Sequence, residues 1–499
     1  MSAKAGPREW LGLFVLLLPT TLLFLAMTVL FLATPQIAAD LRPSGNELLW
    51  VNDVYGFMMA GLLVAMGTVG DRIGRRKVLL FGAALFGVAS VLAAFAPNAG
   101  LLIGARALMG IGAAAVMPST LSLISAMFAD ARQRATAIGT WAASVSVGVA
   151  VGPLVGGLLL ESFWWGAALL IGVPVMALVV IAAPLLVPDY KAPGTGLPDG
   201  LSVLLSMATL LPLVYGVKEF SKSGLTLTAV LTAVAGLAFG VWFVRRQLRL
   251  EVPLLDVRLF GNRTFSGALG VFLLSAIALG GVYLLFTQYL QLVAGLSPLE
   301  SGLWILPAAL ALVAVSTLSP VLARKVRPAY VVAAGSLLSL VGYVVLTQVE
   351  SAAGLPVLIT GFYVLYPGIA PTMALTTGMV IGAAPPEKAG AASAVNTTAS
   401  DLGVSLGIAL MGSIGTAVYQ AGMGHAPAEA ADSLSGALAT GSFVDDARAA
   451  FTSGLNAASV VAAVLVAGAA LLAVTLLRRV PAAGTAAPAA SEEEVPVSV

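Results

Sequence analysis

Fourteen apolar runs divide this chain of 499 residues, and a water-soluble fold could not bury so many long apolar segments. Hydrophobic residues make up 59% of the chain and its mean hydropathy is +1.00, whereas soluble domains contain about 45–50% apolar residues. A helix needs about 20 mostly apolar residues to cross a bilayer, and only structures that pair their own backbone groups are stable there. We therefore predict an all-α membrane protein. The runs lie near 10–35, 46–69, 78–96, 99–124, 133–159, 164–187, 199–217, 225–244, 264–291, 301–323, 328–348, 353–384, 389–419 and 454–477.

The distribution of lysine and arginine tests this count, because cytoplasmic connections carry an excess of both. With fourteen spans, one set of connections holds most of the cations, including the cluster at 72–77. The other set holds only Arg42, Lys218, Lys222 and Arg448. This asymmetry predicts a multi-pass protein of the cytoplasmic membrane with both termini in the cytoplasm.

Composition excludes several kinds of chemistry. The absence of cysteine excludes disulfides, thiol nucleophiles and thiolate metal sites. His425 is the only histidine, so a histidine metal centre or a catalytic triad is also excluded. The net charge of +2 is too small to indicate a nucleic-acid partner. With no phosphate-cradling loop either, we expect no enzyme activity, no metal and no cofactor, and an ion gradient rather than ATP as the energy source.

A short charged loop connects the second and third runs. It reads Gly67-Thr-Val-Gly-Asp71-Arg72-Ile-Gly74-Arg75-Arg76-Lys77. Its cations suit a topological anchor, but an anchor explains neither the embedded acid nor the spaced glycines. The pattern resembles the loop signature of the major facilitator superfamily, which lies between the same two spans. In a gating role, charge pairs from this loop to a neighbouring helix would hold one face closed and release on opening.

Further motifs resemble the fourteen-span drug:proton antiporters of that superfamily. They are Leu49–Tyr55, Arg106–Gly110, the connection Gln288–Leu303 and the segment Ala389–Asn396. The resemblance implies two six-helix bundles around a central cavity, at 1–190 and 264–480, joined by two linking helices within 191–263. Residues 420–453 would form an extracellular loop, ordered or floppy, to which we assign no chemistry. Residues 481–499 read as a disordered tail.

A glycine-proline stretch at 148–157 matches the fifth-span motif typical of exporters. It contains Gly148, Gly152, Pro153, Gly156 and Gly157. Small residues pack helices closely and proline kinks them, so tight packing explains part of the motif. The resemblance adds that this contact favours export over uptake.

Asp401 is the main candidate for proton coupling. It lies about a dozen residues into the thirteenth run with no cation within one helical turn, and hydrocarbon surroundings disfavour its charged form. A proton and a cationic substrate can compete for such a carboxylate, which is the coupling step of an antiporter. A buried structural hydrogen bond is the alternative.

Asp53 and Arg106 are the other ionisable candidates. Asp53 either joins the proton pathway or is a solvated acid near the outer end of its span, beside the aromatic residues Trp50 and Tyr55. Arg106 either faces the cavity and tunes the proton affinity of an acid, or extends to the outer interface.

One position departs from the family pattern. Relatives commonly carry an aspartate in the first span, where this chain has Ala26. The acids that relatives carry around the tenth and twelfth spans are also missing; Tyr366 and Pro367 occupy the place of one. Either Asp53 and Asp401 suffice, or the cargo is less cationic, or this copy was altered at position 26.

We expect an apolar, aromatic cavity that binds a lipophilic small molecule through ring–cation attraction and charge pairing. Its candidate lining residues are Tyr283, Phe286, Gln288, Tyr289, Gln291, Trp304, Tyr363, Tyr366, Asn396 and Thr397. The leading hypothesis is a monomeric, proton-coupled multidrug exporter, with protons and the bilayer as its other partners. Open alternatives are a dedicated exporter of one natural product, an uptake symporter, and a membrane enzyme or receptor, for which the chain offers no chemistry.

Overall fold

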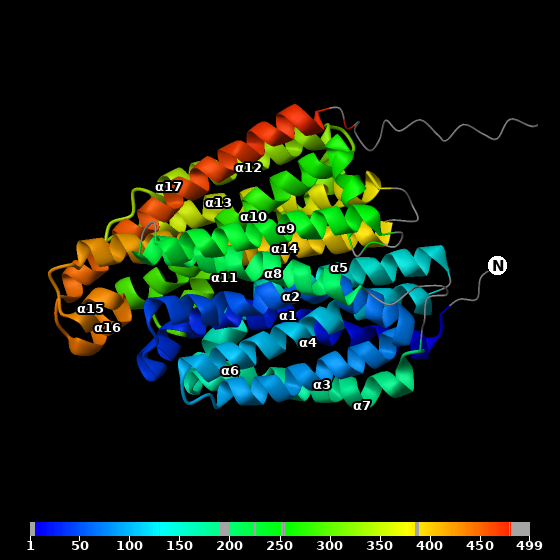
Figure 1. Ribbon diagram of the computed structural model, residues 1–499, viewed down its shortest axis with the longest axis horizontal. Coiled ribbons are helices and arrows are strands. Elements are labelled where there is room, and N and C mark those ends of the chain that lie inside the picture. The colour runs from blue at the N-terminus through cyan, green and yellow to red at the C-terminus, as the bar shows by residue number, and fades with distance from the viewer. Residues whose placement is uncertain are drawn as a thin grey trace, which may run out of the picture.

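In the computed structural model, residues 5–128, 130–189, 199–223, 226–250, 253, 255–384, 389–478 and 480 are described, and all regular elements within them are helices (Figure 1). The first group comprises α1 (Pro7–Leu41), α2 (Gly45–Ile73), α3 (Arg75–Ala94), α4 (Ala99–Met127), α5 (Ala131–Ser162), α6 (Trp165–Leu170) and α7 (Gly172–Leu186). Next come α8 (Gly200–Ser223), α9 (Leu227–Arg249) and the short η1 (Val257–Gly261). The last group comprises α10 (Arg263–Gln288), η2 (Tyr289–Val293), α11 (Pro298–Leu322), α12 (Pro328–Leu346), α13 (Leu355–Gly382), α14 (Ala389–Gly422), α15 (Ala428–Asp432), α16 (Leu434–Thr440) and α17 (Val444–Leu477).

The prediction of an all-helical membrane protein is confirmed. The structure shows twelve candidate spans among the described residues, so the predicted count of fourteen is not confirmed. In the part of the chain that the structure describes, 12 helical segments are long and apolar enough to cross a bilayer. The runs predicted at 46–69 and 199–217 correspond to α2 and α8, which are not among these twelve. The helix α8 is apolar only over Gly200–Leu213.

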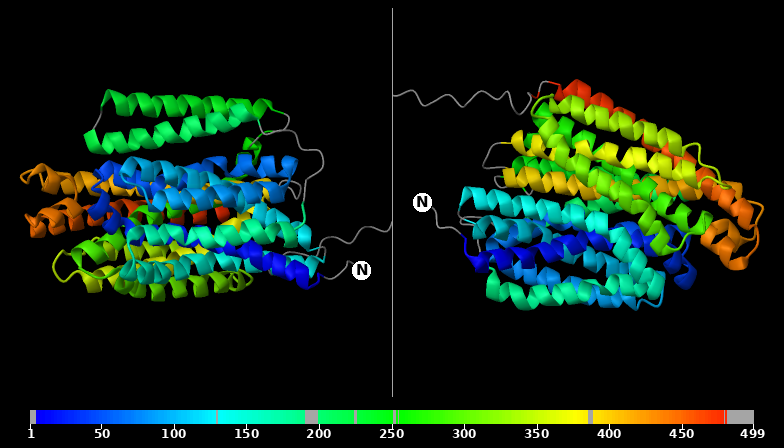
Figure 2. Two further views of the ribbon diagram at one scale, coloured as in Figure 1. Left: turned by 90° about the horizontal axis from the view of Figure 1, so that it is seen from below. Right: turned by 180° about the vertical axis from the view of Figure 1, so that it is seen from behind.

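The helices form two groups with a separate pair beside them. Helices α1 to α7 pack together, as do α10 to α14 with α17. Helices α8 and α9 pack mainly on each other, and Figure 2 (left) shows this pair, the linker hairpin, standing apart from the bundle. The hairpin contacts α2 and α14 through α8.

Small residues allow the closest helix contacts. A methyl group at Gly82 of α3 would lie 2.7 Å from the Gly112 carbonyl of α4. In the second group, a methyl at Gly280 or Gly281 of α10 would clash with the backbone of α14. Such contacts replace a hydrophobic driving force between helices, which lipid does not supply.

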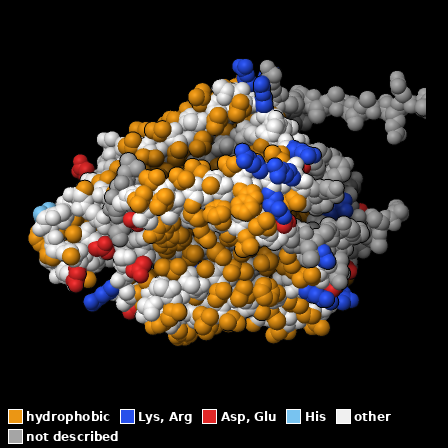
Figure 3. All heavy atoms as spheres, viewed as in Figure 1, with side chains coloured by type: hydrophobic (Ala, Val, Ile, Leu, Met, Phe, Trp, Pro, Cys, Tyr) orange, Lys and Arg blue, Asp and Glu red, His pale blue; other side chains and the backbone are white. Residues whose placement is uncertain are grey.

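The two groups are joined at one end of the bundle. There, Gln291 Nε2 donates to the Leu32 carbonyl at 3.0 Å, and the Gly45 amide donates to Asp432 Oδ2 at 3.2 Å. Asp432 is the last residue of α15. The loop predicted at 420–453 contains the short helices α15 and α16, at the left of Figure 1. This pair is called the outer cap, after the extracellular side on which the sequence predicts it. In Figure 3 most acidic side chains of this face lie toward the outer cap, and most lysines and arginines lie toward the other end.

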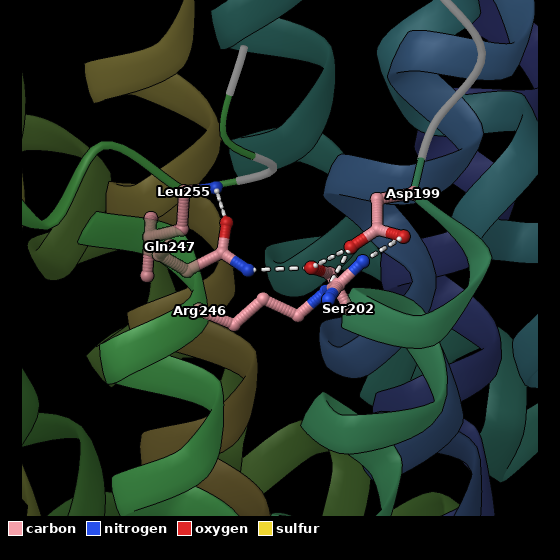
Figure 4. Close-up of polar contacts among 5 residues, drawn as sticks. All are labelled: Asp199, Ser202, Arg246, Gln247 and Leu255. Atoms are coloured by element: carbon pink, nitrogen blue, oxygen red, sulfur yellow. Dashed lines mark hydrogen bonds and ion pairs between the residues drawn. The ribbon is translucent and has the colours of Figure 1, made fainter. Parts of the chain in front are cut away.

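A polar network fixes the other end of the linker hairpin (Figure 4). Arg246 donates from Nε and Nη2 to the Asp199 carboxylate at 2.5 and 2.9 Å. Ser202 also donates to Asp199, and Gln247 bridges Ser202 to the Leu255 amide. The hydrogen bond from Arg246 lowers the pKa of the Asp199 carboxyl to about 2, so this pair is ionised at neutral pH.

Candidate functional site

Arg106 of α4 is buried against α2. Its side chain is 1% exposed, its Nε donates to the Val51 carbonyl at 3.2 Å, and its guanidinium carbon lies 4.6 Å from the centre of the Tyr55 ring. A cation over an aromatic face is attracted by the ring quadrupole. The guanidinium therefore points into the protein at α2 rather than out to an interface.

Asp53 and Asp401 lie near this pair. Asp53 of α2 is 0% exposed, so water does not reach it at this position, and it acts electrostatically on Arg106. Asp401 of α14 is 6% exposed and acts electrostatically on Tyr55. The structure thus brings the three ionisable candidates from α2, α4 and α14 together around one tyrosine.

The contact between α2 and α14 depends on Gly56, three residues after Asp53. A methyl group there would clash with Ser405 Oγ and lie 3.7 Å from the Asp401 carbonyl. On its other side α14 packs tightly on α10, since a methyl at Gly403 would lie 2.6 Å from the Ala276 Cβ. Asp401 therefore sits on a helix held closely between the two groups.

The Asp401 carboxylate is incompletely satisfied. Its Oδ2 is buried and has no hydrogen-bond partner among the described residues. A buried polar atom without a partner is unfavourable, and protonation or a bound cation would relieve it. Ala26 of α1, where the sequence lacks the expected acid, is buried.

An aromatic cluster links α1, α10 and α13. The Phe286 and Phe362 rings stack at 4.0 Å, Phe362 and Tyr366 stack at 4.8 Å, and Tyr283 stacks on Tyr366 at 6.1 Å. Phe31 of α1 meets Tyr283 edge-on at 5.3 Å. This cluster joins three of the candidate lining residues across the two groups, and the Tyr283 hydroxyl has no partner among the described residues.

The remaining candidate lining residues lie elsewhere. Gln288, with Gln291 nearby, is at the joined end, and Tyr289 donates to the Glu350 carbonyl in the connection before α13. Trp304 is 41% exposed, and its carbonyl accepts a hydrogen bond from Tyr363. Asn396 donates from α14 to Thr377 of α13, and Thr397 follows it on α14.

Residues 67–77 were predicted as a loop, but they form the last turns of α2, which ends at Ile73, then Gly74 and the first turn of α3, and they contact α4 and α7. The Arg75 side chain lies over Gly67 and Gly70 of α2. A methyl group at Gly70 would lie 2.8 Å from Arg75 Cδ, and one at Gly67 would lie 3.8 Å from Arg75 Nη1. Arg76 donates to the Pro184 and Val187 carbonyls at the C-terminal end of α7. A cation is stabilising at a helix C-terminus. Gly74 has φ +116°, and a methyl there would lie 2.7 Å from Asp189 Oδ1. Arg72 is exposed, and the Asp71 side chain lies outside the described part of the chain.

The glycines of residues 148–157 serve two partners. Gly148, Gly152 and Gly156 face α1, where a methyl at Gly148 would lie 2.5 Å from the Thr21 carbonyl. Gly157 faces α11 of the other group, where a methyl would lie 2.7 Å from Leu299 Cα. Pro153 also faces α11, because its carbonyl would clash with a methyl at Gly302. The helix α5 therefore packs on both groups at the joined end.

Residues 16–408 match the sequence profile of the Major Facilitator Superfamily. The chain belongs to the major facilitator superfamily. It is a transporter rather than an enzyme, as the sequence predicted.

Relatives that match most of this superfamily member's length are drug efflux and resistance proteins. The multidrug efflux pump LfrA of Mycolicibacterium smegmatis is 41% identical over 494 residues, covering 96% of this chain and 98% of the relative. The methyl viologen resistance protein SmvA of Salmonella typhimurium is 39% identical, covering 81% and 82%. A solved bacterial homologue of the lysosomal transporter Spinster shares the fold, with a TM-score of 0.68 at 18% identity over 95% of this chain and 98% of that one.

Two contributions to this superfamily member's site were missed in the sequence. Tyr55 was expected at most as part of an interfacial aromatic belt, yet it lies under Arg106. Phe31 and Phe362 complete the aromatic cluster. The helical spacing of Phe362 from Tyr366, four residues on, could have indicated a shared face for that pair.

Proposed function

We propose that this protein is a proton-coupled antiporter that exports lipophilic, cationic drugs, dyes or antiseptics across the cytoplasmic membrane by alternating access. In this proposal the chain crosses the membrane fourteen times, with α2 and α8 as the additional spans and both termini in the cytoplasm. Residues 1–190 and 264–480 act as the moving bundles, and the linker hairpin joins them. The functional unit is a monomer.

The observation that carries this proposal is the buried Asp401 carboxylate at the crossing of α2 and α14. One of its oxygens has no hydrogen-bond partner among the described residues, and it faces a tyrosine that also supports a buried arginine. Intramembrane acids are costly unless protonated or paired. Asp401 can therefore hold a proton when one face is open and exchange it for a cationic substrate when the other is open.

Arg106 and Asp53 complete the coupling site in this mechanism. Arg106 is fixed by Val51 and Tyr55, so its positive charge is constant while the charge on Asp401 changes. Asp53 acts on Arg106 from the same helix that meets Asp401. A proton leaving Asp401 thus changes the balance of charge across the α2–α14 contact.

In this proposal each face of the transporter is closed by its own packing contacts. Gly157 and Pro153 close α5 on α11 at the joined end, which the proposed orientation places outside. Residues 67–77 lie at the opposite end, where we propose that they act as a gating latch. Their contacts in this structure are with α4 and α7 of their own group, so the latch would close by forming new contacts with the second group when one bundle rocks against the other.

Reconstituted vesicles test the coupling. Purified protein should move protons in the direction opposite to a lipophilic cationic dye, and Asp401→Asn should abolish both fluxes while the protein still inserts and binds the dye. Asp445→Asn, at an exposed acid of α17, is the matched control and should transport normally. Dye export without proton flux, or full export by Asp401→Asn, would overturn the proposal.

A dedicated exporter of one natural product is the second candidate. The buried Ala26 favours it, because a site with few acids suits a less cationic cargo. A panel of drugs in cells would then give resistance to one compound class only.

A further inference from the structure

An apolar chamber lies between the linker hairpin and the bundle. It has a volume of about 410 Å³ and is bounded by α2, α8, α9, α10 and α14 together with the segment after α9. Its walls include Phe243, Leu255, Phe260, Leu269, Leu273 and Leu402. None of the residues of the aromatic cluster of α10 and α13 lines this chamber.

The polar groups of the chamber offer little to water. Ser206, Thr209 and Ser266 each line it but donate to backbone carbonyls of their own or a neighbouring segment, at 2.7, 2.7 and 2.6 Å. Thr398 Oγ1 is buried without a hydrogen-bond partner among the described residues. A bound water needs two to four polar partners, so the chamber favours an apolar occupant that makes at most one polar contact.

The chamber lies on the lipid-facing side of the protein. Only 11% of the most apolar window of α9 is buried, and among the described residues α9 has extensive contacts only with α8 and η1. Figure 2 (left) shows the hairpin standing beside the bundle rather than within it. An acyl chain in the bilayer can therefore reach the space between α9 and α10.

One exposed arginine, Arg258, lies beside the chamber near the last turn of α9. It stands between Leu255 and Phe260, which both line the chamber. Arg245 and Arg249 lie on the opposite face of α9 from Phe243 and do not line it. Figure 3 shows cationic side chains gathered over this end of α9. The neighbouring Asp256 already accepts a hydrogen bond from the protein. An exposed cation at this place attracts a phosphate and repels a lipophilic cation.

We propose that this chamber binds one acyl chain of an anionic phospholipid, with the lipid phosphate held by the exposed Arg258. The occupant fills the gap between the hairpin and the bundle, so the hairpin docks through lipid as well as through α8. The polar network of Asp199, Ser202, Arg246 and Gln247 holds α8 and α9 together, so the hairpin covers the chamber as one unit. The site would be occupied whether or not transport is driven by protons.

A photoreactive phosphatidylglycerol with a diazirine on one acyl chain tests this site in vesicles. Ser206→Trp fills the chamber, whereas Ser206→Ala leaves it open and is the matched control. Cross-links to the chamber walls should be present in the wild type and Ser206→Ala and lost in Ser206→Trp. The exposed face of α17 at Leu471 is the internal reference and should be labelled equally in all three proteins. Leu273→Trp, from the opposite wall, repeats the test if Ser206→Trp fails to fold.

Charge variants distinguish a lipid from cargo. Arg258→Gln should lower labelling by phosphatidylglycerol relative to phosphatidylcholine about fivefold, since each basic residue near a membrane contributes about 1 kcal/mol. Arg324→Gln, an exposed arginine between α11 and α12, should leave this preference unchanged. Unchanged labelling in both tryptophan variants, equal labelling by the two lipids in the wild type, or displacement of the lipid by a lipophilic cationic dye would overturn the proposal.

Discussion

The guanidinium carbon of Arg106 lies 4.6 Å from the centre of the Tyr55 ring, so a cation of α4 rests on an aromatic face of α2. Both side chains are buried, at 1% and 2% exposure. The Tyr55 hydroxyl has no hydrogen-bond partner among the described residues. The ring, rather than the hydroxyl, is therefore the part of Tyr55 that stabilises the arginine.

Tyr55→Leu should destabilise the protein by about 2 kcal/mol, because a buried cation loses its aromatic partner. Tyr55→Phe keeps the ring and should cost much less. Thermal unfolding of the purified variants in detergent measures both. Equal losses in the two variants would show that the hydroxyl matters and the ring–cation contact does not.

Gly157→Ala should separate α5 from α11, since the added methyl would lie 2.7 Å from Leu299 Cα. Overpacking of this kind costs about 1–3 kcal/mol. It should lower transport by disfavouring closure of the joined end, and cross-linking between α5 and α11 would report the loss. Gly139→Ala on the same helix has no atom within 4 Å of the new methyl and should behave as wild type.

Gly74→Ala should lower the stability of the protein by about 1–3 kcal/mol, because the φ of +116° at this position, between α2 and α3, is strained for any residue with a side chain. The methyl would also approach Asp189 to 2.7 Å. Dye efflux and thermal stability should both fall. Gly378→Ala, in open space on α13, is the control, and a comparable loss there would remove the argument from backbone strain.

Asp199→Asn should reduce the stability of the linker hairpin by at most about 1 kcal/mol, since the ion pair with Arg246 is partly exposed to solvent. The folded pKa of Asp199 is lowered to about 2, below the ordinary value of about 3.9. The stabilisation is therefore complete above about pH 4 and is lost as the pH falls toward 2. Hydrogen exchange of α8 and α9 should differ between variant and wild type at pH 7 and 5 and converge at lower pH. A difference at pH 2 as large as the one at pH 7 would contradict this assignment.

Ala26→Asp should extend the exported range toward more cationic dyes, if the first-span acid sets that range. Ala26 is buried, so the new carboxylate would need a proton or a substrate charge. Efflux of a panel of dyes of differing charge, at several external pH values, measures the change. Ala26→Asn, which adds similar bulk without charge, should not broaden the range.

Hydropathy alone predicted most of the helices, because an apolar segment such as 454–477 has few alternatives in a bilayer; the helix α17 that contains it begins earlier, at Val444, within the predicted loop. Hydropathy was less decisive about whether α2 and α8 cross the membrane, because charged or polar residues interrupt their apolar runs. The placement of Asp401 within a helix also followed from the sequence. Its neighbours did not, since the meeting of Gly56 with Ser405 depends on how two distant helices pack.

The outer cap illustrates the same limit. Helices α15 and α16 are short and rich in alanine, and short helices are marginal without tertiary contacts. Tyr419 donates to the Ala430 carbonyl, and Asp432 accepts from the Gly45 amide. These contacts come from residues far apart in the chain, so composition indicated only a loop.

The hydrogen bond between Asp432 and Gly45 has a practical consequence. It joins a segment of the second group to the first turn of α2, so any opening of that face must break it. In the proposed orientation this bond lies outside the cell. An antibody or peptide that clamps the two partners together would arrest the cycle from the surface, and because it never enters the cytoplasm the pump could not expel it.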